Sequence, residues 1–331
     1  MLKIAVAGFG FMGITHTINI LKNKNLQLVA IVDKNPDNIR KNLAEKTGNF
    51  STGAISMEMF SSVNIYKSLD DCLEHEELDA VVISVHTSLH FELTKKALNA
   101  GKHVFLEKPF CLEMNEGNEM IELARQRNLI LMVGHVVRFM PPYLKLKNWI
   151  ENKKFGALKL LSMHRFSGLP AWGEWKEKQT AFGSSGGALF DLVIHDIDFA
   201  SWALGQPDSI QSTCLPGKLS NQDYVSAIWN YNSKDFKVKI EGGNSFHSTY
   251  PFQAGYTAVF EKASILYSSG DASTIKVSTD TETGQIPVGD ANEGFSGEMD
   301  YFESCINSNQ KPDNCSPESA LKTVALCYKH Q

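Results

Sequence analysis

Apolar and polar residues follow two different patterns along this chain. Up to about residue 134, short apolar runs typical of buried strands alternate with segments that have the spacing of amphipathic helices. The predicted strands are Lys3–Ala7, Gln27–Val32, Asn64–Tyr66, Ala80–Val85, His103–Leu106 and Ile130–Val133. The predicted helices are Met12–Lys22, Pro36–Thr47, Leu69–Glu74, Leu89–Asn99 and Glu113–Arg127. Strands that alternate with helices predict an α/β domain with a doubly wound parallel sheet.

Beyond about residue 155 the chain contains many strand-like segments and few helices between them. These segments are Lys159–Phe166, Ser209–Cys214, Val225–Tyr231, Phe236–Glu241, Thr257–Glu261, Ser264–Tyr267 and Thr274–Val277. Many alternate apolar and polar residues, which predicts a mainly antiparallel sheet with one wetter face. Two helices, Gly297–Asn307 and Pro317–His330, are predicted to close the chain. We therefore predict two domains, residues 1–134 and residues 135–331.

Composition narrows the class of protein. A chain of 331 residues exceeds what one hydrophobic core usually serves. The net charge of −5 argues against nucleic acid as a partner, and no apolar run reaches the roughly 18 residues that a membrane span needs. The N-terminal apolar run ends in a glycine turn and predicts a first strand, not a signal peptide. Six scattered cysteines without a Cys-x-x-Cys motif fit a reducing, cytoplasmic location.

A glycine pattern follows the first predicted strand. Gly8, Gly10 and Gly13 stand where a dinucleotide-binding turn needs a tight bend, close approach to a pyrophosphate and close helix packing. Phe11 and Met12 lie between them, at the N-terminal end of the predicted helix that would face the anion. Asp33 ends the second strand 20 residues after Gly13, where an acidic side chain binds a ribose 2′-hydroxyl. Its charge would repel a 2′-phosphate, so NAD is favoured over NADP, although the neighbouring Lys34 weakens this preference.

Glu107-Lys108-Pro109 directly follows the predicted strand His103–Leu106. Ligands of doubly wound folds bind beyond the carboxyl ends of the parallel strands. Lys108 is therefore predicted to act on a substrate beside a bound nicotinamide.

Asp191, His195 and Asp198 are spaced four and three residues apart, which places them on one face of a helix. Three interpretations compete. His195 supports packing through a carboxylate; the three side chains bind a divalent metal; or His195 exchanges a proton with a substrate hydroxyl while Asp191 orients it. The preceding dinucleotide motif favours proton exchange, and we predict no metal site.

These segments together resemble the Gfo/Idh/MocA oxidoreductase family over almost the whole chain. The resemblance rests on the glycine motif, Thr87–His90, Ala100–Pro109, Gly134–Pro141 and Gly186–Asp198. It implies a Rossmann domain joined to a domain with a large open sheet, through which members form homodimers or homotetramers. It also implies hydride transfer between NAD and a secondary alcohol or ketone of a sugar, sugar derivative or cyclitol.

The resemblance assigns roles to individual residues. Lys108 and His195 would form the catalytic pair, with Asp191 beside them. Glu107 and Pro109 would hold Lys108 and border the cofactor, and His90 and Arg138 would lie near the cofactor and substrate.

Three positions depart from the family pattern. Val193 replaces a common glycine and would narrow the approach to its helix, His86 replaces a common proline, and Val137 replaces a common glutamate. Two alternative functions stay open: NAD-dependent glycoside cleavage, and a non-catalytic NAD-binding regulator.

Overall fold

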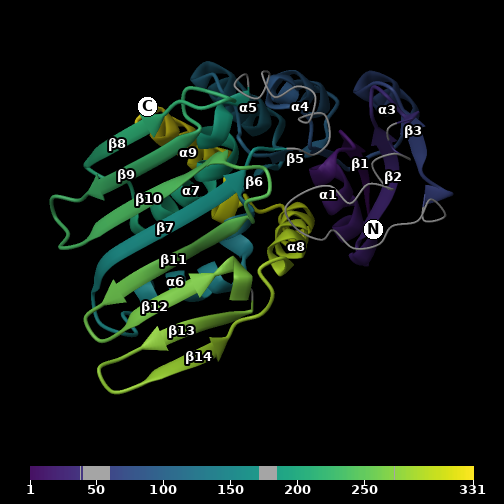
Figure 1. The fold of residues 1–331 in the computed structure, drawn as a ribbon. Helices are drawn as coiled ribbons and strands as arrows, with labels where there is room; N and C mark the ends of the chain where they lie inside the picture. Colours follow the sequence, from purple (N-terminus) through teal and green to yellow (C-terminus); the bar gives the residue numbers. More distant parts are fainter. Residues whose placement is uncertain (38, 40–59, 171–184, 272) are drawn as a thin grey trace. The chain divides into compact units, whose positions relative to one another are not determined.

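A computed structural model describes residues 1–37, 39, 60–170, 185–271 and 273–331 (Figure 1). The chain divides into two compact units. The described part of the first unit consists of residues 1–37, 39, 60–135 and 295–321, and that of the second consists of residues 136–170, 185–271, 273–294 and 322–331. Residues 295–321 thus join the N-terminal unit, although the predicted domain boundary at residue 134 grouped them with the C-terminal domain.

The first unit is built on a six-stranded sheet in the order β3-β2-β1-β4-β5-β6. Every pair of neighbouring strands is parallel, which confirms the predicted doubly wound sheet. The strands are β1 (Leu2–Ala7), β2 (Leu26–Val32), β3 (Asn64–Tyr66), β4 (Ala80–Ile83), β5 (His103–Glu107) and β6 (Leu131–Gly134). β1, β4 and β6 are almost wholly buried, as expected for strands covered on both faces.

The helices that connect the strands of this sheet form where the sequence predicts them. They are α1 (Phe11–Lys22), α3 (Leu69–His75), α4 (His90–Asn99) and α5 (Met114–Arg127), with a short 3₁₀ turn, η2 (Thr87–Leu89), before α4. The Ser68 hydroxyl caps α3 by accepting a hydrogen bond from the Asp71 amide, and Asn128 ends α5 in the left-handed conformation. The predicted helix Pro36–Thr47 lies almost entirely outside the described residues.

The second unit contains an eight-stranded mixed sheet in the order β14-β13-β12-β11-β7-β10-β9-β8 (Figure 1). Only β7 and β10 pair in parallel; the other neighbours are antiparallel. The strands are β7 (Leu158–Gly168), β8 (Ser209–Leu215), β9 (Tyr224–Asn230), β10 (Lys237–Phe246), β11 (Gln253–Phe260), β12 (Ser264–Ser268), β13 (Thr274–Ser278) and β14 (Thr283–Pro287). The mainly antiparallel sheet is therefore confirmed.

Two elements of this unit are absent from the sequence prediction. β14 is almost fully exposed and joins the sheet edge through its backbone, so it lacks the apolar alternation that marks a strand. α6 (Pro141–Glu151) begins with two prolines, which suit the first turn of a helix. It buries Tyr143, Leu146 and Trp149 on one side, at the spacing of three residues that a helix face requires.

One face of the second sheet is covered by α6 and by α7 (Ile194–Leu204). The Tyr143 ring packs edge-on against Tyr256 and Tyr267 of the sheet, and the Tyr256 hydroxyl donates a 2.8 Å hydrogen bond to the Pro142 carbonyl. The opposite side of the sheet, which α6 and α7 do not cover, is called the open face below. Two further helices, α8 (Glu293–Ser308) and α9 (Pro317–Tyr328), complete the described chain.

Among the helices that the structure describes, none combines the length and apolar content needed to cross a bilayer.

Candidate functional site

The glycine turn after β1 has the geometry that a dinucleotide-binding loop needs. Gly8 adopts φ +88°, and a Cβ atom there would lie 2.5 Å from the Ser84 carbonyl oxygen. A Cβ atom on Gly13 would lie 2.0 Å from the Gly8 carbonyl oxygen. Only glycine fits at these two positions, because the loop folds back tightly against the first turn of α1.

Gly10 differs from the other two glycines. It is the N-cap of α1, and a Cβ atom there would meet no atom of the described residues within 4 Å. Phe11 and Met12 follow in the partly exposed first turn of the helix. The N-terminal amides of a helix bind anions, and the open space at Gly10 allows a phosphate to approach the backbone. The loop therefore fits the pyrophosphate of a dinucleotide.

Asp33 follows β2 and is held by the same loop. One carboxylate oxygen accepts a 3.0 Å hydrogen bond from the Phe9 amide, and the other accepts a 2.9 Å bond from the Asn35 amide. Each oxygen can accept a second hydrogen bond. Asp33 is partly exposed, so it retains acceptors for a ribose hydroxyl while it anchors the glycine turn.

The Glu107-Lys108-Pro109 segment lies where β5 ends, and its Lys108–Pro109 peptide bond is cis. Glu107 is buried, and its Oε1 lies 2.6 Å from Nε2 of His16 on α1. Its Oε2 accepts a 3.1 Å hydrogen bond from the Lys108 amide. Lys108 itself is partly exposed. Because β1, β2 and β5 are parallel, the glycine turn, Asp33 and Lys108 all follow strand ends on the same edge of the sheet.

Burial and hydrogen bonding shift the pKa of Glu107 in opposite directions. Burial raises its pKa, but the hydrogen bond to His16, together with the charge and the backbone amide of Lys108, outweighs burial and leaves the pKa below its ordinary value. Glu107 is therefore an ionised carboxylate in the interior of the first unit, directly behind Lys108.

His90, predicted to bind the cofactor, is buried at the start of α4. Its Nδ1 lies 2.9 Å from the Pro109 carbonyl and its Nε2 lies 3.2 Å from the Val85 carbonyl. Burial lowers the pKa of His90 to about 4, so the ring is neutral at physiological pH and donates to one carbonyl at a time. It connects the loop after β4 to the loop after β5.

In the second unit, Asp191 and His195 lie on consecutive but different helical segments. Asp191 belongs to a π-helical turn, Leu189–Val193, and His195 to the first turn of α7. Both side chains are partly exposed, whereas their immediate neighbours are buried. π-helical turns are rare and are found frequently at functional sites.

The helical spacing predicted that Asp198 lies on the same face as Asp191 and His195. Unlike those two side chains, Asp198 is not partly exposed. It is buried, and its two oxygens accept bonds of 2.7 and 2.6 Å from the Arg138 guanidinium. Thr323 donates a further 2.8 Å bond. This pairing balances the charge of Asp198 and removes the basis for a metal site that includes it. Arg138, expected near cofactor and substrate, is buried in the same pair.

A second buried ion pair holds α7 at the residue next to His195. Arg165 of β7 lies 2.9 Å from Asp196 through Nη2 and 3.3 Å through Nε. Burial raises the pKa of Asp196, and the charge and hydrogen bonds of Arg165 oppose this shift. Removing one partner of such a pair leaves an uncompensated buried charge, which costs about 3–5 kcal/mol. This ion pair therefore holds the first turn of α7, which carries His195, against β7.

Val193 is fully buried, and its Cγ2 lies where a side chain on Gly242 of β10 would extend. Its bulk packs onto the sheet, so the expectation that it narrows the approach to the helix is wrong. His86, at the N-cap of η2, lies 3.1 Å from the Ser88 hydroxyl through Nδ1.

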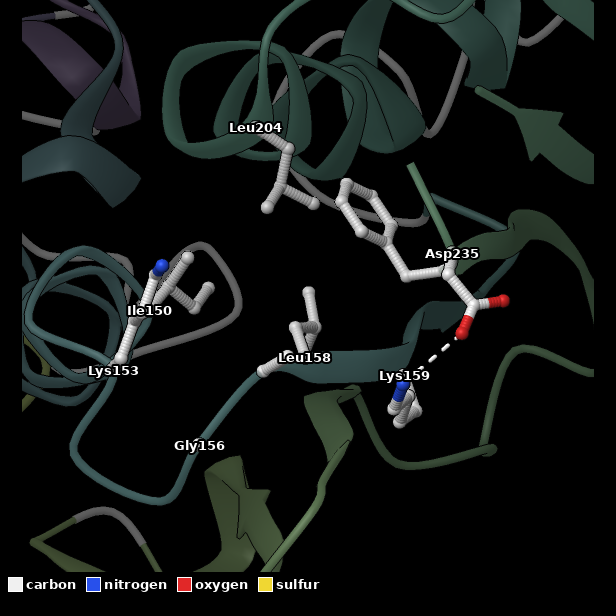
Figure 2. Close-up of a pocket in the computed structure, with 9 residues that line it drawn as sticks. Ile150, Lys153, Gly156, Leu158, Lys159, Leu204 and Asp235 are labelled. Carbon is white, nitrogen blue, oxygen red and sulfur yellow. Dashed lines mark hydrogen bonds and ion pairs between the residues drawn. The ribbon is translucent and has the colours of Figure 1, made fainter. Parts of the chain in front are cut away.

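A pocket of about 220 Å³ in the second unit contains none of the predicted site residues (Figure 2). Its lining is mostly apolar and includes Ile150, Leu158, Leu204 and Phe236, with the Lys159–Asp235 ion pair at 3.0 Å on its edge. Its charged lining residues are Lys153, Lys159 and Asp235, and Lys159 and Asp235 are paired with each other.

The sequence reasoning did not find His16 or Glu298. His16 is a fully buried polar residue in a helix whose other buried positions are mostly apolar, and that mismatch is the one local signal. Glu298 has no local signal, because its surroundings come from segments far away in the sequence.

Comparisons with known proteins identify both units. Residues 2–135 match the model of the oxidoreductase family with an NAD-binding Rossmann fold, GFO/IDH/MocA, and residues 143–266 match the model of the GFO/IDH/MocA C-terminal domain.

Individual relatives are more distant. An uncharacterized oxidoreductase of Schizosaccharomyces pombe is 36% identical over 180 residues, which cover 54% of this chain and 46% of the relative. A myo-inositol 2-dehydrogenase of Thermotoga maritima is 30% identical over 205 residues, covering 62% of this chain and 55% of the relative. The chain thus spans about half the length of these curated relatives.

Among solved structures, the UDP-N-acetylglucosamine 3-dehydrogenase of Acidithiobacillus ferrooxidans has a TM-score of 0.78 at 20% sequence identity. The match covers 99% of this chain and 95% of that chain. At this identity the likeness shows a shared fold.

The different surroundings of two glycines generate a prediction. Gly10→Ala should weaken NADH binding by roughly tenfold or more, about 1.4 kcal/mol, because its methyl group occupies the space for the pyrophosphate. Its stability should stay within about 1 kcal/mol of wild type, because the backbone is extended and nothing is displaced. Gly13→Ala should instead lower the free energy of unfolding by about 1–3 kcal/mol through overpacking.

Urea unfolding and titration of NADH fluorescence measure the two quantities. Unchanged NADH affinity in Gly10→Ala would show that no cofactor approaches the backbone at this turn.

Proposed function

Because the chain belongs to the GFO/IDH/MocA family of NAD-binding oxidoreductases, we propose that it transfers hydride between NAD and a ring-bearing secondary alcohol or ketone. The substrate class is a sugar, a sugar derivative or a cyclitol. The observation that carries the proposal is the position of Lys108, at the same sheet edge as the glycine turn and Asp33. A lysine held there lies where this fold binds its ligands.

The names of two relatives support the substrate class. One is a myo-inositol 2-dehydrogenase and the other a UDP-N-acetylglucosamine 3-dehydrogenase. Both names describe oxidation at a ring carbon that bears a hydroxyl group, which is the chemistry proposed for this chain.

The proposed mechanism divides the work among Lys108, His195 and Asp191. When bound, NAD supplies the hydride acceptor. During oxidation the substrate hydroxyl must lose its proton, and His195 is suited to accept it because histidine ordinarily titrates near neutral pH. Asp191 orients the imidazole. Lys108 donates a hydrogen bond to the substrate oxygen, and in the reverse direction it polarises the carbonyl. We propose that His90, Glu107 and Pro109 do not react themselves but hold the loop that carries Lys108.

A screen of cyclitols, sugars and nucleotide sugars for NADH formation tests the proposed activity. With the best substrate, His195→Ala should lower kcat by about 10²- to 10⁴-fold, the usual contribution of a positioned proton-transfer group, and Lys108→Ala by about 10²- to 10³-fold, the usual cost of removing a hydrogen-bond donor to the reacting oxygen. NADH binding should stay near the wild-type value. Wild-type turnover in either variant would reject the role of that residue.

An NAD preference is proposed from the environment of Asp33. A carboxylate about 4 Å from a 2′-phosphate is repelled by up to ~4 kcal/mol at intermediate dielectric, and by less where it is partly exposed. Wild type should therefore bind NADH at least roughly tenfold more tightly than NADPH, or about 1.4 kcal/mol. Asp33→Ser should reduce this ratio. Equal or tighter NADPH binding by wild type would contradict the assignment.

We also propose that the open face of the second sheet forms a homodimer or homotetramer. Leu160, Ile228 and Leu266 lie on this face by strand register and are 37%, 44% and 43% exposed. The proposal is supported by the family resemblance, which implies association through this sheet, and these three side chains would lie in that interface.

The double variant Ile228→Glu/Leu266→Glu should therefore be a monomer in size-exclusion chromatography with light scattering, because it places charges on the proposed interface. Leu144→Glu is the matched control, since Leu144 is 42% exposed on α6, a helix that covers the opposite face. A wild-type monomer would reject the proposed assembly.

A further inference from the structure

Three titratable side chains meet in the interior of the first unit. His16 comes from α1, Glu107 from the end of β5 and Glu298 from α8. His16 and Glu298 are fully buried, and Glu107 is 5% exposed. One nitrogen of His16 and one oxygen of each carboxyl lie within 4.8 Å of one another. A group of this kind in an apolar interior needs a physical explanation.

The two carboxyls face different nitrogens of the imidazole. Nε2 of His16 lies 2.6 Å from Glu107 Oε1, whereas Nδ1 lies 3.8 Å from Glu298 Oε1. Among the residues that the structure describes, neither oxygen of Glu298 has a hydrogen-bond partner, and neither does Nδ1 of His16. The ring is held edge-on against Phe105, with centroids 4.9 Å apart.

A shared metal ion does not explain this geometry. Two ligands bound at about 2.1 Å to one tetrahedral ion would be separated by more than 3 Å. The 2.6 Å contact between His16 and Glu107 is instead a hydrogen bond. It directs Nε2 toward Glu107 and leaves Nδ1 to face Glu298.

Two ionised carboxylates this close together in a buried site would repel each other strongly, so one of them must hold a proton. Glu107 accepts a hydrogen bond from the Lys108 amide, and in the tautomer that carries its proton on Nε2, His16 donates a second one; both stabilise the charge of Glu107. No group in the described part of the chain donates a hydrogen bond to Glu298. Hydrogen bonding therefore assigns the charge to Glu107 and the proton to Glu298.

The directions of the pKa shifts agree with this assignment. Burial, followed by repulsion from Glu107, raises the pKa of Glu298 well above its ordinary value. At Glu107 the interactions with His16 and Lys108 outweigh burial.

We propose that His16 and Glu298 are positioning residues, in which a neutral Glu298 acid and His16 orient the Glu107 carboxylate and thereby the backbone of Lys108. A movement of about 1 Å would let the Glu298 hydroxyl donate to Nδ1 of His16. The resulting chain runs from Glu298 through His16 to Glu107 and ends at the Lys108 amide. Its effect on catalysis rests on the function proposed for Lys108, whereas the protonation of Glu298 does not.

Gly134 of β6 has no side chain, and the space at this position is occupied by the Phe105 ring and the Glu107 carboxylate. A Cβ atom at Gly134 would lie 2.9 Å from the Phe105 ring and 3.4 Å from Glu107 Oε1. The absence of a side chain at this position lets the carboxylate and the ring that supports His16 pack together at the end of β5.

Infrared spectroscopy tests the protonation directly. The difference spectrum between wild type and Glu298→Gln, recorded at neutral pH, should show the C=O stretch of a protonated carboxylic acid that is present only in wild type. Glu303→Gln is the matched control, because Glu303 lies on the same helix but is partly exposed. Absence of a protonated-acid band that depends on Glu298 overturns the proposal, whatever the activity of the protein.

Kinetics test the positioning role. Glu107→Gln should lower kcat by about 10²-fold with NADH affinity retained, since a misplacement of about 1 Å at a reacting group costs that much. Glu298→Leu should lower kcat by roughly tenfold, while Glu298→Gln should recover most of the loss because an amide copies the shape and donor of the neutral acid. Equal kcat in Glu298→Leu and wild type, in protein that unfolds at the wild-type temperature, overturns the positioning role.

The infrared and kinetic experiments together distinguish a failure of the proposed function from a failure of the positioning role. If wild type oxidises no substrate in the screen, the function proposed for Lys108 fails, and the infrared spectrum still decides the state of Glu298. If wild type is active but Glu298→Gln loses as much activity as Glu298→Leu, the positioning chain is wrong and the proposed function stands.

Discussion

The pairing of buried carboxylates is the constraint on which both units depend. Glu107, Asp196 and Asp198 are removed from water, and each is matched by a cationic or hydrogen-bonding partner: His16, Arg165 and Arg138 respectively. An ionised group without such a partner in the interior costs several kcal/mol. The end of β5 and the first turn of α7 can therefore adopt their positions only when these partners are in place. Lys108 and His195 are neighbours in sequence of Glu107 and Asp196, so the same pairs that stabilise the fold hold the backbone of the two candidate catalytic residues.

Because the sheet of the first unit is parallel, residues that are far apart in the sequence follow strand ends at the same edge of the sheet. The glycine turn follows β1, Asp33 follows β2 and Lys108 follows β5, and parallel strands end at one edge. Hydrogen bonds then connect the loops to one another: the Phe9 amide binds Asp33, and His90 lies between the carbonyls of Val85 and Pro109. A cofactor-binding surface is thus assembled from short loops that a rigid scaffold supports, which is the usual division of labour in such folds.

Much of this arrangement could be predicted from local sequence. The strands of the first unit were located to within two residues, because their apolar runs are bounded by turns and polar segments. The glycine turn was identified because each glycine has a distinct steric reason. β14 could not be found, since an exposed edge strand held by backbone hydrogen bonds needs no apolar alternation. The position of Asp198 was also wrong, because helical spacing alone does not show that Arg138, 60 residues earlier, draws its carboxylate inward.

The sequence by itself determined the family, the dinucleotide turn, the lysine at a strand end and the acidic residue after β2. These features depend on steric and periodic rules that act over a few residues. Only the tertiary structure decided which carboxylates are buried, which partner each one has and which one holds a proton. His16 and Glu107 are 91 residues apart, and Glu298 comes from the far end of the chain. The ionisation of such groups depends on desolvation and on neighbours brought together by folding, and no local pattern of residues carries that information.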